Sequence, residues 1–405
     1  MKVKNIGLFI LIMLTAGGLL CACADKKKPE PDASEPASQT DVYEKGYDLP
    51  IDDEVREEAS ADCKAVMGQI QSIYQDAEKG SASNVVVPGE TMAQMKELVK
   101  EKGNPVTSAE HYAVMENYQK MESFLENAKQ GQSGSVILYE IGSDGGVARG
   151  QYSYDGTDMY VLAARAMWDD AGEARMTYVS YTRLKDWAYT EKGWFCYELC
   201  VPEPPEVTEI VDGSRMVRVR PLTEACIAAS EKYVLPLGYQ GNNLLCSDWD
   251  REHMEQLDYN GMFEYLYSMK YGNKLETEHY PDGIPAEEFE QVIMEYLPVT
   301  AEQIRVWAVF DEAKGSYAWV RLGCGNYAPA FFDISTPEVV AVQEHEDGTV
   351  TLTVDAVCSK MMRNDAVITH ELTVQPQEDG SFRYLGNKIL DDGLEHIPNY
   401  QYRFA

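Results

Sequence analysis

Apolar residues near the start of the folded part of the chain recur with the spacing of an α-helix. Between residues 55 and 77 they form a single stripe, which predicts one long helix. A second helix is expected from Thr91, with Gln94 as its capping-box partner, and a third from Thr107, with Glu110 as its partner. The N-terminal part of the folded chain is therefore predicted to be helical.

The period then changes to that of β-strands. Segments rich in β-branched and aromatic residues are separated by turns such as Asp144-Gly145 and Asp155-Gly156. Strands are predicted over residues 135–141, 147–154, 159–168, 174–184 and 193–201. Short strands joined by glycine turns are typical of an antiparallel meander.

The second half repeats this order of helices followed by strands. Helices are expected over residues 222–235, over 253–271 with an interruption at Gly261, and over 286–297. The later strands are predicted over residues 304–310, 316–323, 338–345, 349–358, 366–374 and 381–390. The chain is thus predicted to be an α+β protein, with helices packed on antiparallel meander sheets. Two NTF2-like or cystatin-like modules are expected, over residues 51–220 and 221–405.

One short motif occurs in both halves. D-G-T begins at Asp155 and again at Asp347, and E-x-G-x-F-x-Y follows at Glu191 and at Glu378. Internal duplication of a helix-plus-meander module explains the repetition. Independent reuse of glycine turns flanked by aromatic residues also explains it and needs no common ancestry. The sequence leaves both explanations open.

The first residues have the pattern of an export signal. Two lysines precede an uncharged run over residues 6–20, which suits a secretory signal and is short for a membrane-spanning helix. Ala22 and Cys23 then resemble the lipobox of bacterial lipoproteins, in which a small residue precedes the cysteine that receives the lipid. We therefore expect residues 1–22 to be a lipoprotein signal peptide and Cys23 to be lipidated. An ordinary cleaved signal and an uncleaved anchor are the alternatives.

Residues 23–50 are expected to be the lipidated cysteine and a disordered tether. The stretch after Cys23 is rich in Pro, Ser and charge and poor in large apolar side chains. Such a segment cannot bury enough apolar surface to offset the entropy lost on ordering. The predicted location is the extracytoplasmic face of the cell membrane, with the membrane itself as a partner through the N-terminal lipid.

The net charge of the chain limits its possible binding partners. The 405 residues include 67 Asp and Glu against 35 Lys and Arg, which gives a net charge of −32. Because this surface repels phosphates, no nucleic-acid partner is expected.

The cysteines beyond Cys23 form no CxxC pair and are odd in number, so most are interpreted as small buried residues.

Three segments of the second half carry a family resemblance. Their order, over residues 284–305, 337–357 and 378–390, resembles a group of uncharacterised lipoproteins from Gram-positive bacteria. The resemblance covers about residues 284–390 and agrees with the lipobox and the tether. It implies a location, and it implies no catalytic residue, cofactor or mechanism.

Candidate chemistry is sparse. The chain contains no G-x-S-x-G, Walker A or HExxH motif, so no catalytic residue, metal ligand or cofactor is assigned. Paired acids that could act in hydrolysis are Asp52-Asp53, Asp169-Asp170, Asp311-Glu312 and Asp391-Asp392. The 26 tyrosines suit either sheet cores or a recognition surface. Tyr400, Tyr402 and Phe404 alternate as on one face of a strand.

These observations favour a non-enzymatic, membrane-anchored lipoprotein on the outer side of the membrane. It is predicted to bind a ligand, a glycan, a peptide or a protein of the cell envelope. The alternative is a cell-wall or glycan hydrolase that uses paired carboxylates, for which two facing acids in one aromatic-lined cleft are required.

Overall fold

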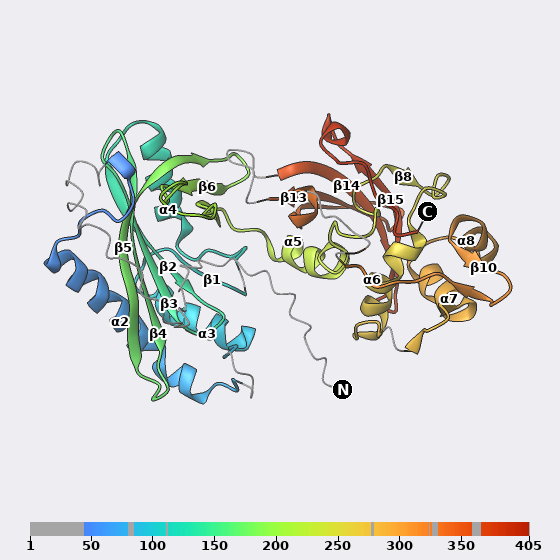
Figure 1. Cartoon of the computed structure of the whole chain (residues 1–405), viewed down its shortest axis with the longest axis horizontal. Helices are drawn as coiled ribbons and strands as arrows, with labels where there is room; N and C mark the ends of the chain where they lie inside the picture. The colour runs from blue at the N-terminus through green and yellow to red at the C-terminus, as the bar shows by residue number, and fades with distance from the viewer. Residues whose placement is uncertain are drawn as a thin grey trace, which may run out of the picture. The chain divides into compact units, whose positions relative to one another are not determined.

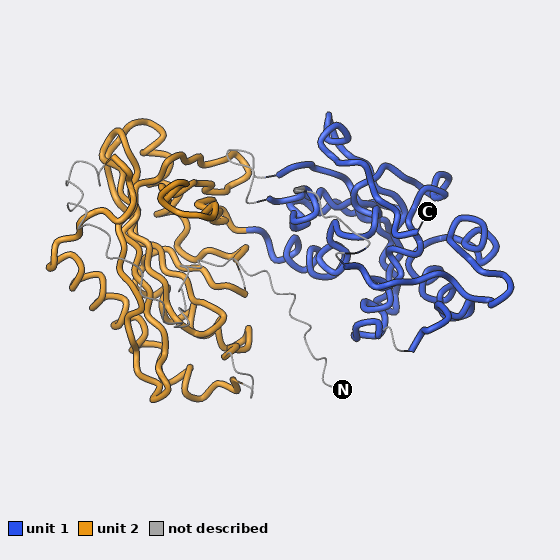
Figure 2. The backbone as a smooth tube through the Cα atoms, viewed as in Figure 1, with its two compact units in different colours: residues 1–8, 222–405 blue, residues 9–221 orange. Residues whose placement is uncertain are grey.

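The computed structural model describes residues 44–79, 85–110, 112–276, 279–323, 325, 331–358 and 366–404. Within it the chain divides into two compact units, and the division falls between Pro221 and Leu222 (Figure 2). Each unit combines helices with largely antiparallel sheets, so the predicted α+β class is confirmed. The predicted signal peptide, Cys23 and most of the tether lie outside the described residues.

The first unit is built on a seven-stranded sheet whose strands lie side by side in chain order (Figure 1). The strands are β1 (Val106–Ser108), β2 (Gly134–Ile141), β3 (Val147–Tyr154), β4 (Met159–Trp168), β5 (Ala174–Tyr189), β6 (Trp194–Leu199) and β7 (Ser214–Arg218). Neighbours are antiparallel, except that β1 runs parallel to β2. The meander predicted for this region is confirmed strand by strand from β2 to β6.

Helices cover both faces of this sheet. They are α2 (Asp53–Asp76), α3 (Gly89–Lys100) and α4 (Tyr118–Lys129). The buried stripe of α2 and α3 packs with Tyr139, Ile141 and Val147 on one face. On the other face α4 packs its Met121, Phe124 and Leu125 side chains among strand residues. Each face of the sheet therefore has a core of its own.

Two helices of this unit are present, but their predicted starts are wrong. α3 begins at Gly89 and has no side-chain cap, so the capping box expected at Thr91 is absent. Thr107 starts no helix, because it lies in β1, where it pairs with Glu140 of β2. All three β1 residues are buried, so pairing at the edge of the sheet overrides the local capping signal. The helix expected there begins at Tyr118 instead.

The sheet curls around the face that carries α4. Tyr152 lies on β3 and Tyr197 on β6, with two strands between them, which would separate them by about 14 Å in a flat sheet. Their hydroxyl oxygens are nevertheless 2.9 Å apart. Register shifts on both sides of β5, at Arg165/Ala166 and at Leu184/Asp186, are bulges of the kind that bend a strand. We call the face that bears both tyrosines the concave face.

The second unit contains a five-stranded sheet in the order β12-β13-β14-β15-β8 and a small sheet in the order β10-β11-β9. The strands are β8 (Trp249–Asp250), β9 (Ile284–Pro285), β10 (Phe310–Asp311), β11 (Ser316–Tyr317), β12 (Thr336–Glu344), β13 (Val350–Val357), β14 (Ala366–Pro376) and β15 (Phe382–Ile389). The helices are α5 (Glu224–Ala229), continued by a π-turn at Ser230–Val234, α6 (Tyr259–Tyr271), α7 (Ala286–Tyr296) and α8 (Ala301–Trp307). One core joins these elements.

Several boundaries in this unit differ from the predictions. Residues 304–310 were expected as a strand, but most of them belong to α8, which starts with a complete capping box between Thr300 and Gln303. The strand expected over 316–323 is limited to Ser316–Tyr317. α6 begins at Tyr259 behind the side-chain cap of Asp258, so Gly261 lies in its first turn and interrupts nothing.

The repeated motif falls at equivalent hairpins of the two sheets. D-G-T forms the β3–β4 and β12–β13 turns, and E-x-G-x-F-x-Y spans the β5–β6 and β14–β15 turns. In the latter pair the backbone bonding is the same: Thr190 donates to Trp194 and Gly193 to Thr190, as Gln377 donates to Ser381 and Gly380 to Gln377. The β2–β3 turn has this bonding without the motif, so duplication and reuse of a favourable turn both still explain the repetition.

The structure also tests the predictions for the cysteines and for the C-terminal tyrosines. The cysteines interpreted as small buried residues are buried with free thiols wherever the structure describes them, namely Cys63, Cys196, Cys200, Cys226, Cys246 and Cys358. The C-terminal tyrosines form no strand, and the rings of Tyr400 and Tyr402 instead meet edge to face, 5.0 Å apart. Within the described ranges, no helix has the length and apolar character needed to cross a membrane.

Candidate functional site

The paired acids singled out from the sequence are all exposed. Asp52-Asp53 lies at the start of α2, and the other pairs lie in a turn, at the end of β10 and just after β15: Asp169-Asp170, Asp311-Glu312 and Asp391-Asp392. Exposed carboxylates lack the enclosure that distinguishes the acid and base of a glycoside hydrolase. None of these pairs therefore forms a candidate active site.

Two acids that the sequence did not single out face each other in the second unit. Glu338 on β12 lies directly opposite Asp355 on β13, and each residue is only 1% exposed. Thr369 of β14 donates its hydroxyl to Asp355 at 2.6 Å. Residues at such positions have Cβ atoms about 5 Å apart, within the range of hydrolase pairs. Their burial closes them to a glycan chain.

Among the described residues, the most enclosed histidine is also structural in character. His370 on β14 is fully buried and lies between the Tyr239 hydroxyl, 2.9 Å from Nε2, and Asn387 Oδ1, 2.6 Å from Nδ1. Burial lowers the pKa of His370 to about 4, so the ring is neutral at physiological pH. Nδ1–H then donates to Asn387, and Nε2 accepts from Tyr239. In the described parts of the chain, no group of three or more His, Cys, Asp or Glu residues is placed to hold a metal ion.

A different kind of polar group lies on the concave face of the first unit. Glu140 of β2, Ala148 of β3, Arg165 of β4 and Tyr178 of β5 are successive cross-strand partners, so they form one row across the sheet. Tyr197 pairs with Arg215 of β7 and so adds that residue to the same face. The concave-face cluster consists of Glu140, Tyr152, Arg165, Tyr178, Tyr197 and Arg215.

The neighbouring row of the same sheet face contains small residues. Gly150 of β3, Ala163 of β4 and Ser180 of β5 are successive partners in the neighbouring row of the sheet. The Tyr152 ring lies over Gly150, because a Cβ atom there would be only 3.1 Å from Cε2 of the ring. The small residue at position 150 therefore makes room for the Tyr152 ring.

Glu140 is the unusual member of the cluster. Its residue keeps part of its surface open to solvent, yet burial raises the pKa of the carboxyl to about 7, with Arg165 opposing and Asp144 adding to the rise. The Glu140 carboxyl makes no hydrogen bond or ion pair with any residue that the structure describes. Arg165 is already engaged, since its Nη2 donates to Asp144 Oδ2 at 2.8 Å.

Arg215 is also incompletely satisfied, and its charge acts on the Tyr178 hydroxyl. Arg215 Nη1 donates to the backbone oxygens of Asp212 at 3.2 Å and Ser214 at 2.7 Å, which fixes the guanidinium. Its buried Nε–H has no acceptor within the described ranges. Burial raises the pKa of the Tyr178 hydroxyl, and the charge of Glu140 also raises it. The charges of Arg165 and Arg215 oppose this rise in pKa. Charges from β2, β4 and β7 therefore act on one hydroxyl of β5.

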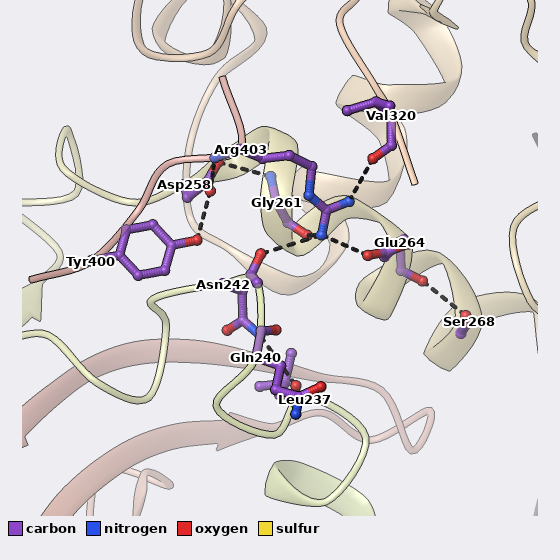
Figure 3. Close-up of polar contacts among 11 residues, drawn as sticks. Leu237, Gln240, Asn242, Asp258, Gly261, Glu264, Ser268, Val320, Tyr400 and Arg403 are labelled. Atoms are coloured by element: carbon purple, nitrogen blue, oxygen red, sulfur yellow. Dashed lines mark hydrogen bonds and ion pairs between the residues drawn. The ribbon is translucent and has the colours of Figure 1, made fainter. Parts of the chain in front are cut away.

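In a second polar cluster, in the second unit, the charged groups pair with one another, although Nε of Arg403 has no acceptor among the described residues (Figure 3). Arg403 Nη2 forms an ion pair with Glu264 Oε1 at 2.6 Å, and Nη1 donates to the backbone oxygen of Val320 at 3.2 Å. Asp258, the cap of α6, accepts the Tyr400 hydroxyl at 2.6 Å. This cluster holds the C-terminal segment against α6. Its charges have partners, which distinguishes it from the concave-face cluster.

Sequence reasoning missed the concave-face cluster. One signal was present: Glu140 is the only charged residue in its strand, and it follows Val136 and Leu138 on an otherwise apolar face. Nothing in the sequence indicated that Arg215, far along the chain, would share that face. The tyrosines of the first β region were weighed as core or recognition residues. Tyr152 and Tyr197 are buried, whereas Tyr178 is partly exposed.

Comparison with known proteins gives a family without a function. The model of a family of unknown function, DUF6070, matches residues 56–403. The chain belongs to this family. No curated protein and no solved structure matches it. Membership of DUF6070 confirms that the chain comes from an uncharacterised family, and it transfers no role to Glu140 or any other residue. The likeness of the units to NTF2-like or cystatin-like folds stays a prediction.

Proposed function

We propose that this protein is a lipid-anchored, extracytoplasmic binding protein that holds a small ligand on the concave face of its first unit. The export signal and lipobox support the location, and the acidic, tethered chain agrees with a position outside the membrane. The observation that carries the binding function is the Glu140 carboxyl, which lies partly buried on a curled sheet and makes no hydrogen bond or ion pair with a described residue.

An enclosed polar group without a partner costs free energy, typically about 1–3 kcal/mol and more for a charge. Proteins tolerate this cost mainly where the group acts on something else, and perturbed carboxyls accordingly gather at functional sites. Arg215 Nε, on the same face, is also buried without an acceptor among the described residues. A bound ligand would satisfy both.

The hydrolase alternative has weaker support. Glycoside hydrolysis uses two carboxyl groups at a set separation, one on each side of the bond to be cleaved. Near Glu140, the second carboxyl is Asp144, which is held by Arg165 and by the backbone N–H of Gly146 at 2.9 Å. A carboxylate engaged in this way is a poor nucleophile or base. Binding without turnover is therefore favoured.

The ligand proposal is tested by thermal unfolding of residues 24–405, prepared without the lipid. The panel consists of cell-wall fragments, glycans, short peptides, lipids and Ca²⁺. A ligand present at 100 times its dissociation constant stabilises the folded state by about 2.7 kcal/mol, which raises the melting temperature by several degrees. We expect such a shift with at least one panel member, and we expect Glu140→Gln to abolish it.

The control is Glu173→Gln, which removes an exposed carboxyl in the β4–β5 turn of the same unit. This variant is expected to keep the full shift. A panel without any stabilising member, or a shift that survives Glu140→Gln, would contradict the proposed site. Product analysis of any stabilising glycan then decides between binding and hydrolysis.

The lipid anchor has a separate test. With Cys23 replaced by Ala, the full-length chain is expected to move from the membrane fraction to the soluble extracellular fraction, because the thioether-linked lipid can no longer form. Cys21→Ala is the matched control and is expected to leave the protein in the membrane fraction. Retention of the Cys23→Ala protein in the membrane would contradict lipid anchoring and favour an uncleaved anchor.

A further inference from the structure

We propose that residues 45–51 form a releasable strap, which closes over the corner between β5 and β6 of the first unit and uncovers that corner when the N-terminal chain is pulled away. These residues link α2 to the segment that the sequence predicts as a tether to Cys23. The inference stands independently of the ligand proposed above. It follows from the backbone bonds of the strap, from the exposure of its outer contacts and from the groups that it covers.

β5 changes partners at the corner that the strap covers. β4 pairs with β5 as far as Arg183, and β6 pairs with β5 from Leu184 onwards. The backbone oxygen of Arg183 accepts from the N–H of Cys200, which directly follows β6, at 3.0 Å. β6 therefore leaves β5 at this point, and the edge of β5 before Arg183 needs another neighbour.

The strap supplies that neighbour. The Gly46 oxygen accepts from the Arg183 N–H at 2.7 Å, and the Leu49 N–H donates to the Tyr181 oxygen at 3.0 Å. Leu49 is only 4% exposed, so burial of its side chain adds to the two backbone bonds. Because Gly46 pairs with the later of the two β5 residues, the strap runs antiparallel to β5. The end of the strap that leads to the N-terminal chain therefore lies at the corner.

Exposed contacts hold this outer end. Lys45 and Tyr47 both bind the Glu206 carboxylate, in the loop between β6 and β7, and the lysine does so at 3.1 Å. The Lys45 and Glu206 side chains are 42% and 44% exposed, and such ion pairs contribute little to stability and are screened by salt. A pull on the preceding chain reaches these contacts first, and then Gly46 and Leu49 in turn. The strap can thus detach while the core of the unit stays packed.

Gly46 covers a free thiol at the corner. Gly46 has a φ of +77°, and a Cβ atom on it would lie 2.7 Å from Cys200 Sγ and 3.1 Å from Arg183 Nε. Only glycine allows the backbone to approach the thiol so closely. With the strap in place Cys200 is 8% exposed. Release of the strap removes Gly46 from beside the thiol, so the reactivity of Cys200 reports whether the strap is closed.

The test measures alkylation by iodoacetamide in folded residues 24–405 at pH 8, and peptide mass spectrometry follows each cysteine. Gly46→Ala displaces the strap, because its Cβ atom meets Cys200 Sγ. The rate at Cys200 is expected to rise by about tenfold or more in this variant, and also in a chain that begins at residue 52. Glu206→Gln is expected to give a smaller rise, because it weakens only exposed contacts.

Gly131→Ala is the matched control. Gly131 has the same φ of +77°, and no described atom lies within 4 Å of a Cβ atom placed on it. This variant carries the backbone strain without the contact, so Cys200 is expected to react as slowly as in the unchanged protein. Cys63 and Cys196 of the same unit are 0% and 1% exposed and report opening of the whole unit. Their rates are expected to stay unchanged in every variant.

A rise at Cys200 alone, in Gly46→Ala and in the shortened chain, would support the strap. If neither change raised the Cys200 rate, residues 45–51 would not cover the corner and the proposal would be overturned. A joint rise at Cys63, Cys196 and Cys200 would also overturn it, because the unit would then open as a whole. An equal rise in Gly131→Ala would contradict the specific contact at Gly46. None of these outcomes depends on Glu140, so they leave the ligand proposal to its own test.

Discussion

Arg403→Ala is expected to lower the free energy of unfolding of the second unit by about 3 kcal/mol or more, the cost of breaking a buried ion pair by removing one partner. The Arg403 side chain is 1% exposed and pairs with Glu264. The substitution also removes the donor of the Val320 oxygen and leaves that acceptor inside the protein. The loss is measured by urea unfolding monitored by tryptophan fluorescence.

Arg383→Ala is the matched control for this prediction. Arg383 lies exposed on β15 of the same unit, so its removal is expected to change stability by less than about 0.5 kcal/mol. Equal effects of the two substitutions would show that the C-terminal segment contributes little to the unit. A shortened chain that ends at residue 399 is expected to lose at least as much stability as Arg403→Ala, because it also removes Tyr400 from Asp258.

Glu140→Gln is expected to stabilise the ligand-free protein at pH 8, by about 2–3 kcal/mol. Burial raises the pKa of Glu140 to about 7 in the folded state, above the ordinary value of about 4.3 for the unfolded chain. Between these values the folded state keeps a proton that the unfolded state has lost, so stability falls as the pH rises. Each pKa unit corresponds to about 1.4 kcal/mol, and the partial exposure of Glu140 reduces the full difference.

The pH dependence identifies the cause of that effect. Below about pH 4 both states hold the proton, so the carboxyl and amide variants are expected to be equally stable there. The difference is expected to grow through the range from pH 4.5 to 7 and to stay constant above it. Unfolding by urea at pH 4, 6 and 8 measures it, with Glu173→Gln as the control. If the difference in stability between the two proteins did not depend on pH, or if Glu140→Gln were less stable at pH 8, the claim that the Glu140 carboxyl lacks a partner would be contradicted.

Local patterns predicted most of the strands because each strand alternates within itself and ends at a glycine turn. β2 to β6 and β12 to β15 follow the predicted segments closely. The errors arise where contacts with distant residues, or a cap outside the pattern, determine the secondary structure. β1 is a strand because β2 lies beside it, although Thr107 and Glu110 look like a helix start. In α8, the capping box at Thr300 outweighs the β-branched residues that follow.

The candidate site was less predictable than the fold. Glu140 could be recognised as an acid on an apolar strand face, but its lack of partners depends on which side chains reach it. Which side chains reach Glu140 depends on the curl of the sheet. Two bulges in β5 bend the sheet, and the contact between the Tyr152 and Tyr197 hydroxyls is evidence of the curl. The paired acids drew attention because they are adjacent in sequence. Adjacent acids in exposed turns share no enclosed space, so they formed no site.

The central claim is that a ligand occupies the concave face at Glu140, and a crystal structure tests it most directly. Crystals of residues 24–405 are grown with the panel member that raises the melting temperature most. Ligand density is expected on the concave face, with polar atoms of the ligand within hydrogen-bond distance of Glu140 and Arg215. A ligand bound elsewhere, with the Glu140 carboxyl still unpartnered, would contradict it.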